Sequence, residues 1–209
     1  PEIDARRLGK KFDTKNNAEI ADAIVLIIGT ERGLCGKFNQ VLAENAAEWI
    51  ESQRFQTYQI WAMGSRMIRE LERLNIPISW RKPLPASSLP TYQQSYKTTQ
   101  NWLEQYENNA FNQFIVLFNQ TDRGGYQFST VNLLPYKMQH PLSVSEQFEK
   151  KWPPPIIDTD PIGIYQQVIE QYIAASFHQI LLKSAAAEHS SRFNMMQEAE
   201  NNAEEIIAD

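Results

Sequence analysis

The sequence Ala23-Ile-Val-Leu-Ile-Ile28, followed at once by Gly29, decides the fold class. It is a continuous run of apolar, mostly β-branched residues, without the alternation expected of a strand with one face in water. Such runs are typical of strands buried on both faces, as in a parallel sheet covered by helices. The run therefore predicts a buried strand of an α/β domain.

Helices and strands are predicted to alternate along the chain after this strand. Apolar residues at three- and four-residue steps predict amphipathic helices at residues 38–55, 65–74 and 91–109. Apolar and aromatic runs predict strands at residues 58–63, 76–80, 114–118 and 131–134. This order predicts a Rossmann-like layered domain with a mostly parallel sheet.

The last fifty or so residues have a different composition. After Trp152-Pro-Pro-Pro155, Asp160 can cap a helix and Pro161 can occupy its first position. From there to Asp209 there is no further proline, and the only glycine is Gly163. The pattern predicts one helix about 70 Å long at 1.5 Å per residue, a length typical of a coiled coil or an arm. Its residues 185–209 are expected to lack a partner helix in this chain, so that they fray or pair with another chain.

These elements divide the 209 residues into three parts. Residues 1–20 are interpreted as the remnant of an N-terminal helix or loop, residues 21–158 as the globular domain, and residues 159–209 as the long helix. Because the chain starts at Pro1 and both ends lie in helix-compatible sequence, it is expected to be a piece of a longer protein, truncated at both ends.

Composition excludes several kinds of protein. A net charge of −5 disfavours a nucleic-acid partner, which usually meets a basic face. The single cysteine, Cys35, excludes an intrachain disulfide. No apolar run approaches the roughly 20 residues that cross a bilayer, so direct membrane insertion is not expected.

The turn Gly29-Thr-Glu-Arg-Gly-Leu-Cys-Gly36 lies where a dinucleotide-binding fold keeps its phosphate loop. A G-x-G-x-x-G loop would need glycine at the position of Glu31, and a Walker A loop would need Ser or Thr at Phe38. Turn geometry and close helix–strand packing therefore explain these glycines better. The alternative, a nucleotide- or dinucleotide-binding α/β enzyme that uses the Gly29–Gly36 turn, stays open, as does a scaffold whose helical arm binds another partner.

Residues with catalytic potential do not converge in the sequence pattern. Glu188 and His189 are adjacent on a helix, where neighbours point about 100° apart, so a solvated or subunit-facing polar face is expected. The three histidines, His140, His178 and His189, share no metal-ligand spacing. Cys35 is interpreted as a small buried filler. No catalytic residue, cofactor or metal site is predicted.

Two segments together resemble the gamma subunit of F-type ATP synthases. The first, Thr30-Glu-Arg-Gly-Leu-Cys-Gly-Lys-Phe-Asn39, is similar to the family's strand-end motif. The second, which begins Ser184-Ala-Ala-Ala-Glu-His189, is similar to its S-x-x-[AS]-E-H-x-x-R-x-x-A-M-x-x-A-x-x-N-A motif. The resemblance assigns structural or subunit-contact roles to Arg32, Gly33, Leu34, Cys35, Gly36, Asn39, Glu188, His189, Arg192, Met196, Ala199, Asn202 and Ala203.

The resemblance implies a mechanical function. The long helix would belong to an antiparallel coiled coil that turns inside the ring of alpha and beta subunits and couples ion flow to ATP synthesis or hydrolysis. Further implied partners are the epsilon subunit and the membrane c-ring. The implied location is peripheral, on the cytoplasmic face of the bacterial inner membrane or on a thylakoid-type membrane.

Two departures from the family pattern affect these expectations. Met195 stands where the family usually has alanine, so local packing in the shaft should differ. Residues 83–130 match loosely, a divergence similar to that of the alternate, sodium-linked ATPases. The family's N-terminal long helix and its C-terminal motif have no counterpart in these 209 residues.

Overall fold

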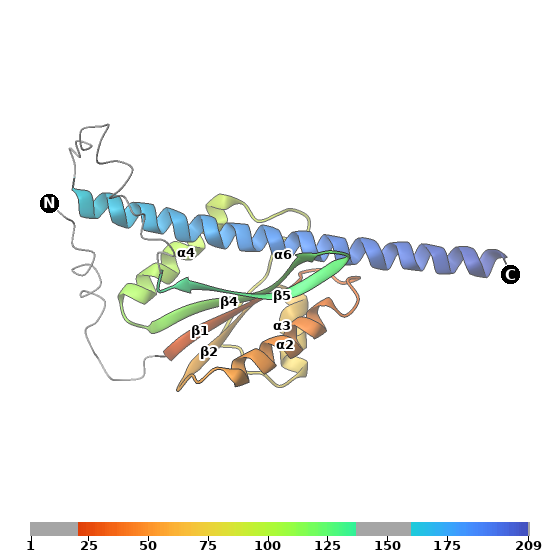
Figure 1. Cartoon of the computed structure of the whole chain (residues 1–209), viewed down its shortest axis with the longest axis horizontal. Coiled ribbons are helices and arrows are strands. Elements are labelled where there is room, and N and C mark those ends of the chain that lie inside the picture. Colours follow the sequence, from red (N-terminus) through yellow and green to blue (C-terminus); the bar gives the residue numbers. More distant parts are fainter. Residues whose placement is uncertain (1–20, 137–159, 209) are drawn as a thin grey trace, which may run out of the picture.

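The computed structural model describes residues 21–136 and 160–208 of the chain (Figure 1). Its middle layer is a five-stranded sheet with the order β3-β2-β1-β4-β5. β1 to β4 are parallel where they pair, and β5 pairs antiparallel with β4. The predicted mostly parallel α/β sheet is thereby confirmed. The strands are β1 (Ala21–Ile28), β2 (Tyr58–Met63), β3 (Trp80–Lys82), β4 (Phe111–Asp122) and β5 (Gly125–Leu134).

Helices cover both faces of this sheet, as Figure 1 shows. Alternate residues of β1 divide between the two faces: Ile24, Leu26 and Ile28 join one hydrophobic cluster, and Ala23, Val25 and Ile27 join the other. The continuous apolar run of β1 follows from this burial on both sides. The helices are α2 (Phe38–Ser52) and α3 (Ser65–Arg73) on one face, and α4 (Tyr92–Glu107) and α6 (Pro161–Ala208) on the other.

Some predicted boundaries differ from the structure. The third strand exists, but its predicted bounds, residues 76–80, are wrong, because β3 begins only at Trp80 and ends at Lys82. Ile76 and Ile78 instead pack as side chains against the cluster under α2 and α3. The helix predicted to reach residue 55 ends at Ser52, where Gln53 turns to extended backbone and the chain can place Phe55 against Trp49, with ring centroids 6.1 Å apart.

The last two strands form a longer hairpin than predicted. β4 and β5 pair from Phe114 with Leu134 to Asp122 with Gly125, so Thr121-Asp-Arg-Gly124 lies at the hairpin end. Most of β5 is half-buried or exposed and carries polar residues. The prediction of residues 131–134 therefore covered only the C-terminal part of β5, where Leu133 and Leu134 are buried.

Helix α6 begins and extends as predicted. Asp160 caps it, with Oδ1 accepting from Ile162 N at 3.1 Å and Oδ2 from Gly163 N at 3.3 Å. It contains 48 residues, about 70 Å at 1.5 Å per residue. Its middle packs on the sheet through Ile173, Phe177 and Ile180, and its C-terminal part projects beyond the sheet (Figure 1).

Several predictions fall outside the described residues. They concern residues 1–20, the segment with Trp152-Pro-Pro-Pro155, and His140. The division of the chain at residues 20 and 158 stays a prediction. Within residues 21–136 and 160–208, no helix is both long enough and apolar enough to cross a bilayer.

Candidate functional site: the strand-end turn and helix α6

The strand-end turn, residues 29–37, is held by its own hydrogen bonds. Thr30 N donates to Asn39 Oδ1 at 2.9 Å, and Asn39 Nδ2 donates back to Thr30 Oγ1 at 2.9 Å. The Thr30 hydroxyl in turn donates to Arg32 O at 2.7 Å. Thr30 is fully buried and Asn39 nearly so. The buried polar groups of the turn thus have hydrogen-bond partners. These hydrogen bonds attach the first turn of α2 to the end of β1.

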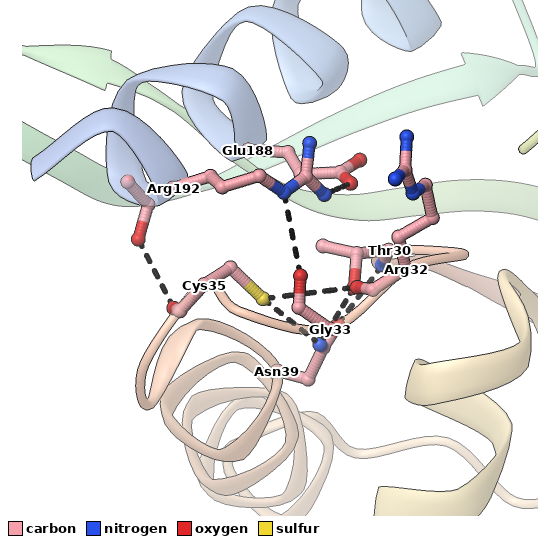
Figure 2. A network of polar contacts seen from close by, with 8 residues as sticks. Thr30, Arg32, Gly33, Cys35, Asn39, Glu188 and Arg192 are labelled. Atoms are coloured by element: carbon pink, nitrogen blue, oxygen red, sulfur yellow. Dashed lines mark hydrogen bonds and ion pairs between the residues drawn. The ribbon is translucent and has the colours of Figure 1, made fainter. Parts of the chain in front are cut away.

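Helix α6 contacts this turn across more than 150 residues of sequence, as Figure 2 shows. Ser191 Oγ donates to Cys35 O at 3.1 Å, and Arg192 Nε donates to Gly33 O at 3.3 Å. Arg192 also forms an ion pair with Glu188, one turn earlier on the helix. The two segments that carry the family resemblance therefore meet in space.

An apolar contact lies beside these polar ones. Cys35, Phe38 and Ala187 are buried together, and Tyr126 of β5 packs against them. The rings of Phe38 and Tyr126 have centroids 4.7 Å apart. Only a small residue at position 187 lets α6 approach the turn this closely, since Ala187 has no exposed surface.

The environment of Cys35 favours the neutral thiol. Burial raises its pKa, and the carboxylate of Glu188 adds to the increase, while a hydrogen bond with Thr30 and the charge of Arg192 act in the opposite direction. The net shift is upward. Since the thiolate is the reactive form, this arrangement supports the interpretation of Cys35 as a buried packing residue.

Glu31 has a role that the sequence pattern did not indicate. Its carboxylate accepts from Ser65 N at 2.9 Å, Ser65 Oγ at 2.6 Å and Leu84 N at 2.8 Å. It therefore connects the strand-end turn to the N-terminus of α3 and to the loop after β3. A carboxylate at a helix N-terminus also interacts favourably with the helix dipole. An acidic residue 34 positions before a helix start is not a recognised capping pattern in sequence.

We expect Glu31→Gln to make stability less dependent on pH. Burial raises the pKa of Glu31, but the hydrogen bonds from Ser65 and Leu84 outweigh it, and the net pKa lies below the ordinary value of a glutamate. A lowered carboxyl pKa stabilises the fold above the unfolded pKa, and this contribution is lost as pH falls through the folded pKa. Wild type should exceed the variant by about 1–2 kcal/mol at pH 7 and by less near pH 3. Urea unfolding at both pH values measures the difference; an equal gap at both would contradict the assignment.

The predicted site residues fall into three groups. Those that lie at the junction of the turn and α6 are Gly33, Cys35, Gly36, Asn39, Glu188 and Arg192. Exposed residues around it are Arg32, Leu34 and His189. Exposed residues on the projecting part of α6 are Met196, Ala199, Asn202 and Ala203.

The expectation that residues 185–209 fray because they lack a partner helix is wrong for the first part of this stretch. Ala187 and Ser191 are buried against the strand-end turn. Met195 also contacts it, because a Cβ on Gly36 would lie 2.8 Å from the Met195 sulfur. The methionine that departs from the family pattern therefore packs over a glycine with a positive φ of 56°. From Met196 to Ile207 the helix is exposed.

The Glu188–Arg192 pair should be energetically coupled. Each side chain is only 15% exposed, so the pair is screened less than a surface ion pair. In a double-mutant cycle of Glu188→Gln and Arg192→Gln, we expect a coupling free energy of about 1–2 kcal/mol. Chemical unfolding of the four proteins measures it. Strictly additive losses would mean that the two side chains act independently.

The two histidines in the described part of the chain, His178 and His189, do not lie in a cluster of metal ligands. His178 Nδ1 lies 3.1 Å from Ser95 Oγ, and its ring meets that of Tyr92 edge to face. His189 is exposed on α6. In the described ranges, no three His, Cys, Asp or Glu side chains are grouped so that they could hold a metal ion.

The chain is similar to proteins of known description. Two curated relatives are ATP synthase gamma chains. That of Nautilia profundicola is 27% identical over 201 residues, covering 95% of this chain and 66% of the relative. That of Caldanaerobacter subterraneus subsp. tengcongensis is 23% identical over 214 residues, covering 99% of this chain and 70% of the relative. The chain thus spans about two thirds of the length of these relatives.

Solved structures agree in fold. A chain of the central stalk and c-ring of the Tetrahymena thermophila mitochondrial ATP synthase superposes with a TM-score of 0.64 at 16% identity, over 92% of this chain and 86% of that one. A rotor chain of the Euglena gracilis enzyme gives 0.60 at 12% identity, over 100% and 79%. At these identities the likeness concerns the fold alone. The family model described as ATP synthase matches residues 4–209, and the chain therefore belongs to the ATP synthase family, the family of these gamma chains.

Proposed function

We propose that this chain is the globular part, with one long helix, of the central rotor-stalk (gamma) subunit of an F-type ATP synthase. It couples transmembrane ion flow to ATP synthesis or hydrolysis by rotating inside the catalytic ring. Membership of the family supports this role. So does the similarity to chains from solved central-stalk and rotor assemblies.

The observation that carries the proposal is the double attachment of α6 to the globular domain. Its middle is embedded in the core through Ile173 and Phe177. About four turns further on, Ser191 and Arg192 bind the backbone of the strand-end turn. A helix held at two separated points cannot swivel independently of the sheet. Torque on the domain is therefore passed to the projecting part of the helix.

The projecting part is suited to pairing with another helix. Phe193, Met196, Ile206 and Ile207 are each more than half exposed. We assign them to the antiparallel coiled coil of the full-length subunit, in contact with the alpha and beta subunits. The globular part would face the epsilon subunit and the c-ring. The subunit itself would supply no catalytic residue, and it would lie peripherally on the cytoplasmic face of the bacterial inner membrane or on a thylakoid-type membrane.

Reconstitution tests this function. The full-length subunit that contains this segment is co-expressed with alpha and beta subunits, one of which carries an affinity tag. We expect purification through the tag to recover the subunit in an assembly that hydrolyses ATP and rotates in a single-molecule assay. A folded subunit that never joins the assembly would overturn the proposal. Micromolar binding of ATP or NAD to the isolated 209-residue chain would favour the nucleotide-binding enzyme instead.

Hydrogen exchange should divide α6 at about residue 195. Amides around Phe177 and Ser191 are covered by the sheet and the turn, whereas residues 196–207 are exposed on every face. We expect slow exchange in the first region and exchange at least about a hundredfold faster in the second, as in a helix without tertiary contacts. Equal protection of both regions in a dilute monomer would contradict the proposed unpaired state of the projecting part.

A further inference from the structure

A cavity lies between the parallel sheet and α4, outside the junction described above. Its volume is about 600 Å³, within the range of small-molecule sites. Trp80, Trp102 and Phe177 form apolar walls, and Pro83 and Pro90 mark the loop at its edge. Lys82 at the end of β3 and Lys97 on α4 are its charged lining residues.

The position of the cavity is one where α/β folds bind ligands. Met63 and Lys82 are the last residues of β2 and β3, and both line it. In open α/β sheets, ligands bind outside the carboxyl ends of parallel strands. The cavity at the end of β1 is smaller, about 180 Å³, and is lined by the carboxylates of Glu31 and Glu188, so the larger open space beside β2 and β3 is the better candidate for an anion.

The charge of the lining selects for an anion. No Asp or Glu occurs among the described residues that line the cavity, although the chain as a whole has a net charge of −5. Lys82 Nζ donates to Thr98 Oγ1 at 2.7 Å, while Thr98 Oγ1 donates to Gln94 O at 2.8 Å. Within residues 21–136 and 160–208, no carboxylate forms an ion pair with Lys82. Two of the three N–H bonds of its ammonium are left for a ligand.

The solvation of Lys82 agrees with this geometry. Burial lowers the pKa of its ammonium group, because the positive charge has lost part of its water without gaining a negative partner. A carboxylate placed beside it would restore the missing interaction.

The apolar walls define the rest of the ligand. Trp102 is 4% exposed and Phe177 1% exposed, and their rings meet edge to face with centroids 4.7 Å apart. Trp80, which is half-buried, also stands edge to face with Trp102, with centroids 6.1 Å apart. Because Trp102 and Phe177 are almost fully buried, the aromatic surface open to a ligand is that of Trp80, which these contacts hold in place. A rigid indole favours a flat ring system over a flexible polar molecule.

We propose that this cavity binds a small aromatic carboxylate, with its ring system against the accessible part of Trp80 and its carboxylate on Lys82. Lys97 adds long-range attraction from the rim. This binding site is independent of the rotor function proposed above and requires no contact with other subunits.

Titration of the 209-residue chain with 2-naphthoate tests the site, with heat and tryptophan fluorescence as readouts. We expect saturable binding of 2-naphthoate. The neutral 2-naphthamide should bind at least about tenfold more weakly, because it lacks one charge-assisted hydrogen bond. Lys82→Gln should lose about tenfold in affinity for 2-naphthoate, and Lys82→Arg should retain most of it. Lys183→Gln, which removes an exposed lysine from α6, should bind like wild type.

Two results would overturn the proposal. One is the absence of saturable 2-naphthoate binding to the wild-type chain. The other is equal affinity for the acid and the amide, which would indicate apolar adsorption to exposed helix surface. Circular dichroism establishes that each variant is folded. If Lys82→Gln fails to fold, photo-crosslinking of the wild-type chain with benzophenone-4-carboxylate decides the matter: adducts must map to residues 80–105 and 177–181, and adducts confined to residues 193–207 would refute the site.

Discussion

Phe177→Ala is expected to lower the free energy of unfolding by about 3–5 kcal/mol. Phe177 is 1% exposed and belongs to the cluster that joins α4 and α6 to the sheet. Its ring contacts that of Trp102, with centroids 4.7 Å apart. Truncation leaves a cavity under α6 that rigid neighbours cannot fill. Urea unfolding followed by circular dichroism measures the loss, and the substitution should also accelerate amide exchange along the middle of α6.

The same helix supplies a matched control. Phe193 is 64% exposed, so Phe193→Ala should change stability by less than about 0.5 kcal/mol. The two substitutions remove identical atoms from one helix, and only burial differs. Comparable losses in both variants would mean that α6 is not anchored to the sheet through Phe177.

Gly64→Ala is expected to destabilise the fold by about 3 kcal/mol or more. Gly64 has a φ of 97°, and a Cβ there would lie 2.7 Å from the carbonyl oxygen of Thr30. That oxygen is fixed because it accepts from Arg66 N at 3.0 Å. Gly64 N itself donates to Lys82 O at 3.0 Å. Neither partner can shift without breaking a contact between β1, β3 and α3.

The hairpin provides controls that separate backbone strain from crowding. Gly124 has a φ of 88°, but a Cβ added there would meet no atom within 4 Å, and Gly125 has open space without a positive φ. Gly124→Ala should therefore cost about 1–2 kcal/mol from strain alone. Gly125→Ala should be nearly neutral. Thermal and urea unfolding of the three variants should give this order. If the Gly64 variant is as stable as the Gly124 variant, the Thr30 carbonyl must move away from the added Cβ, and the predicted crowding is wrong.

Several features of the fold could be predicted because they depend on local sequence. Burial on both faces requires an apolar residue at every position from Ala23 to Ile28, which explains the apolar run of these residues. The start of α6 was predictable because Asp160 caps its own helix within three residues. The start of α4 is similarly local, since Thr91 and Gln94 form a capping box.

Features that depend on distant residues were missed. The polar, half-exposed first part of β5, residues 125–130, has no apolar pattern of its own and pairs with the edge that β4 offers. Ile76 and Ile78 have strand-like composition, but they pack as half-buried side chains against the cluster under α2 and α3, and β3 starts at Trp80. The capping of α3 by Glu31 bridges 34 positions. None of these contacts leaves a periodic signal within one element.

The sequence by itself determined the α/β class, the alternation of strands and helices that gives a mostly parallel sheet, and the long helix. It also contained the two motifs that resemble the gamma family. It left open what those motifs do. Only the tertiary structure brought Gly33 and Cys35 of the strand-end turn against Ser191 and Arg192 of α6. The physical reason is that helix and strand formation depend on neighbouring residues, whereas the angle and rotation of α6 on the sheet depend on contacts between segments more than 150 positions apart.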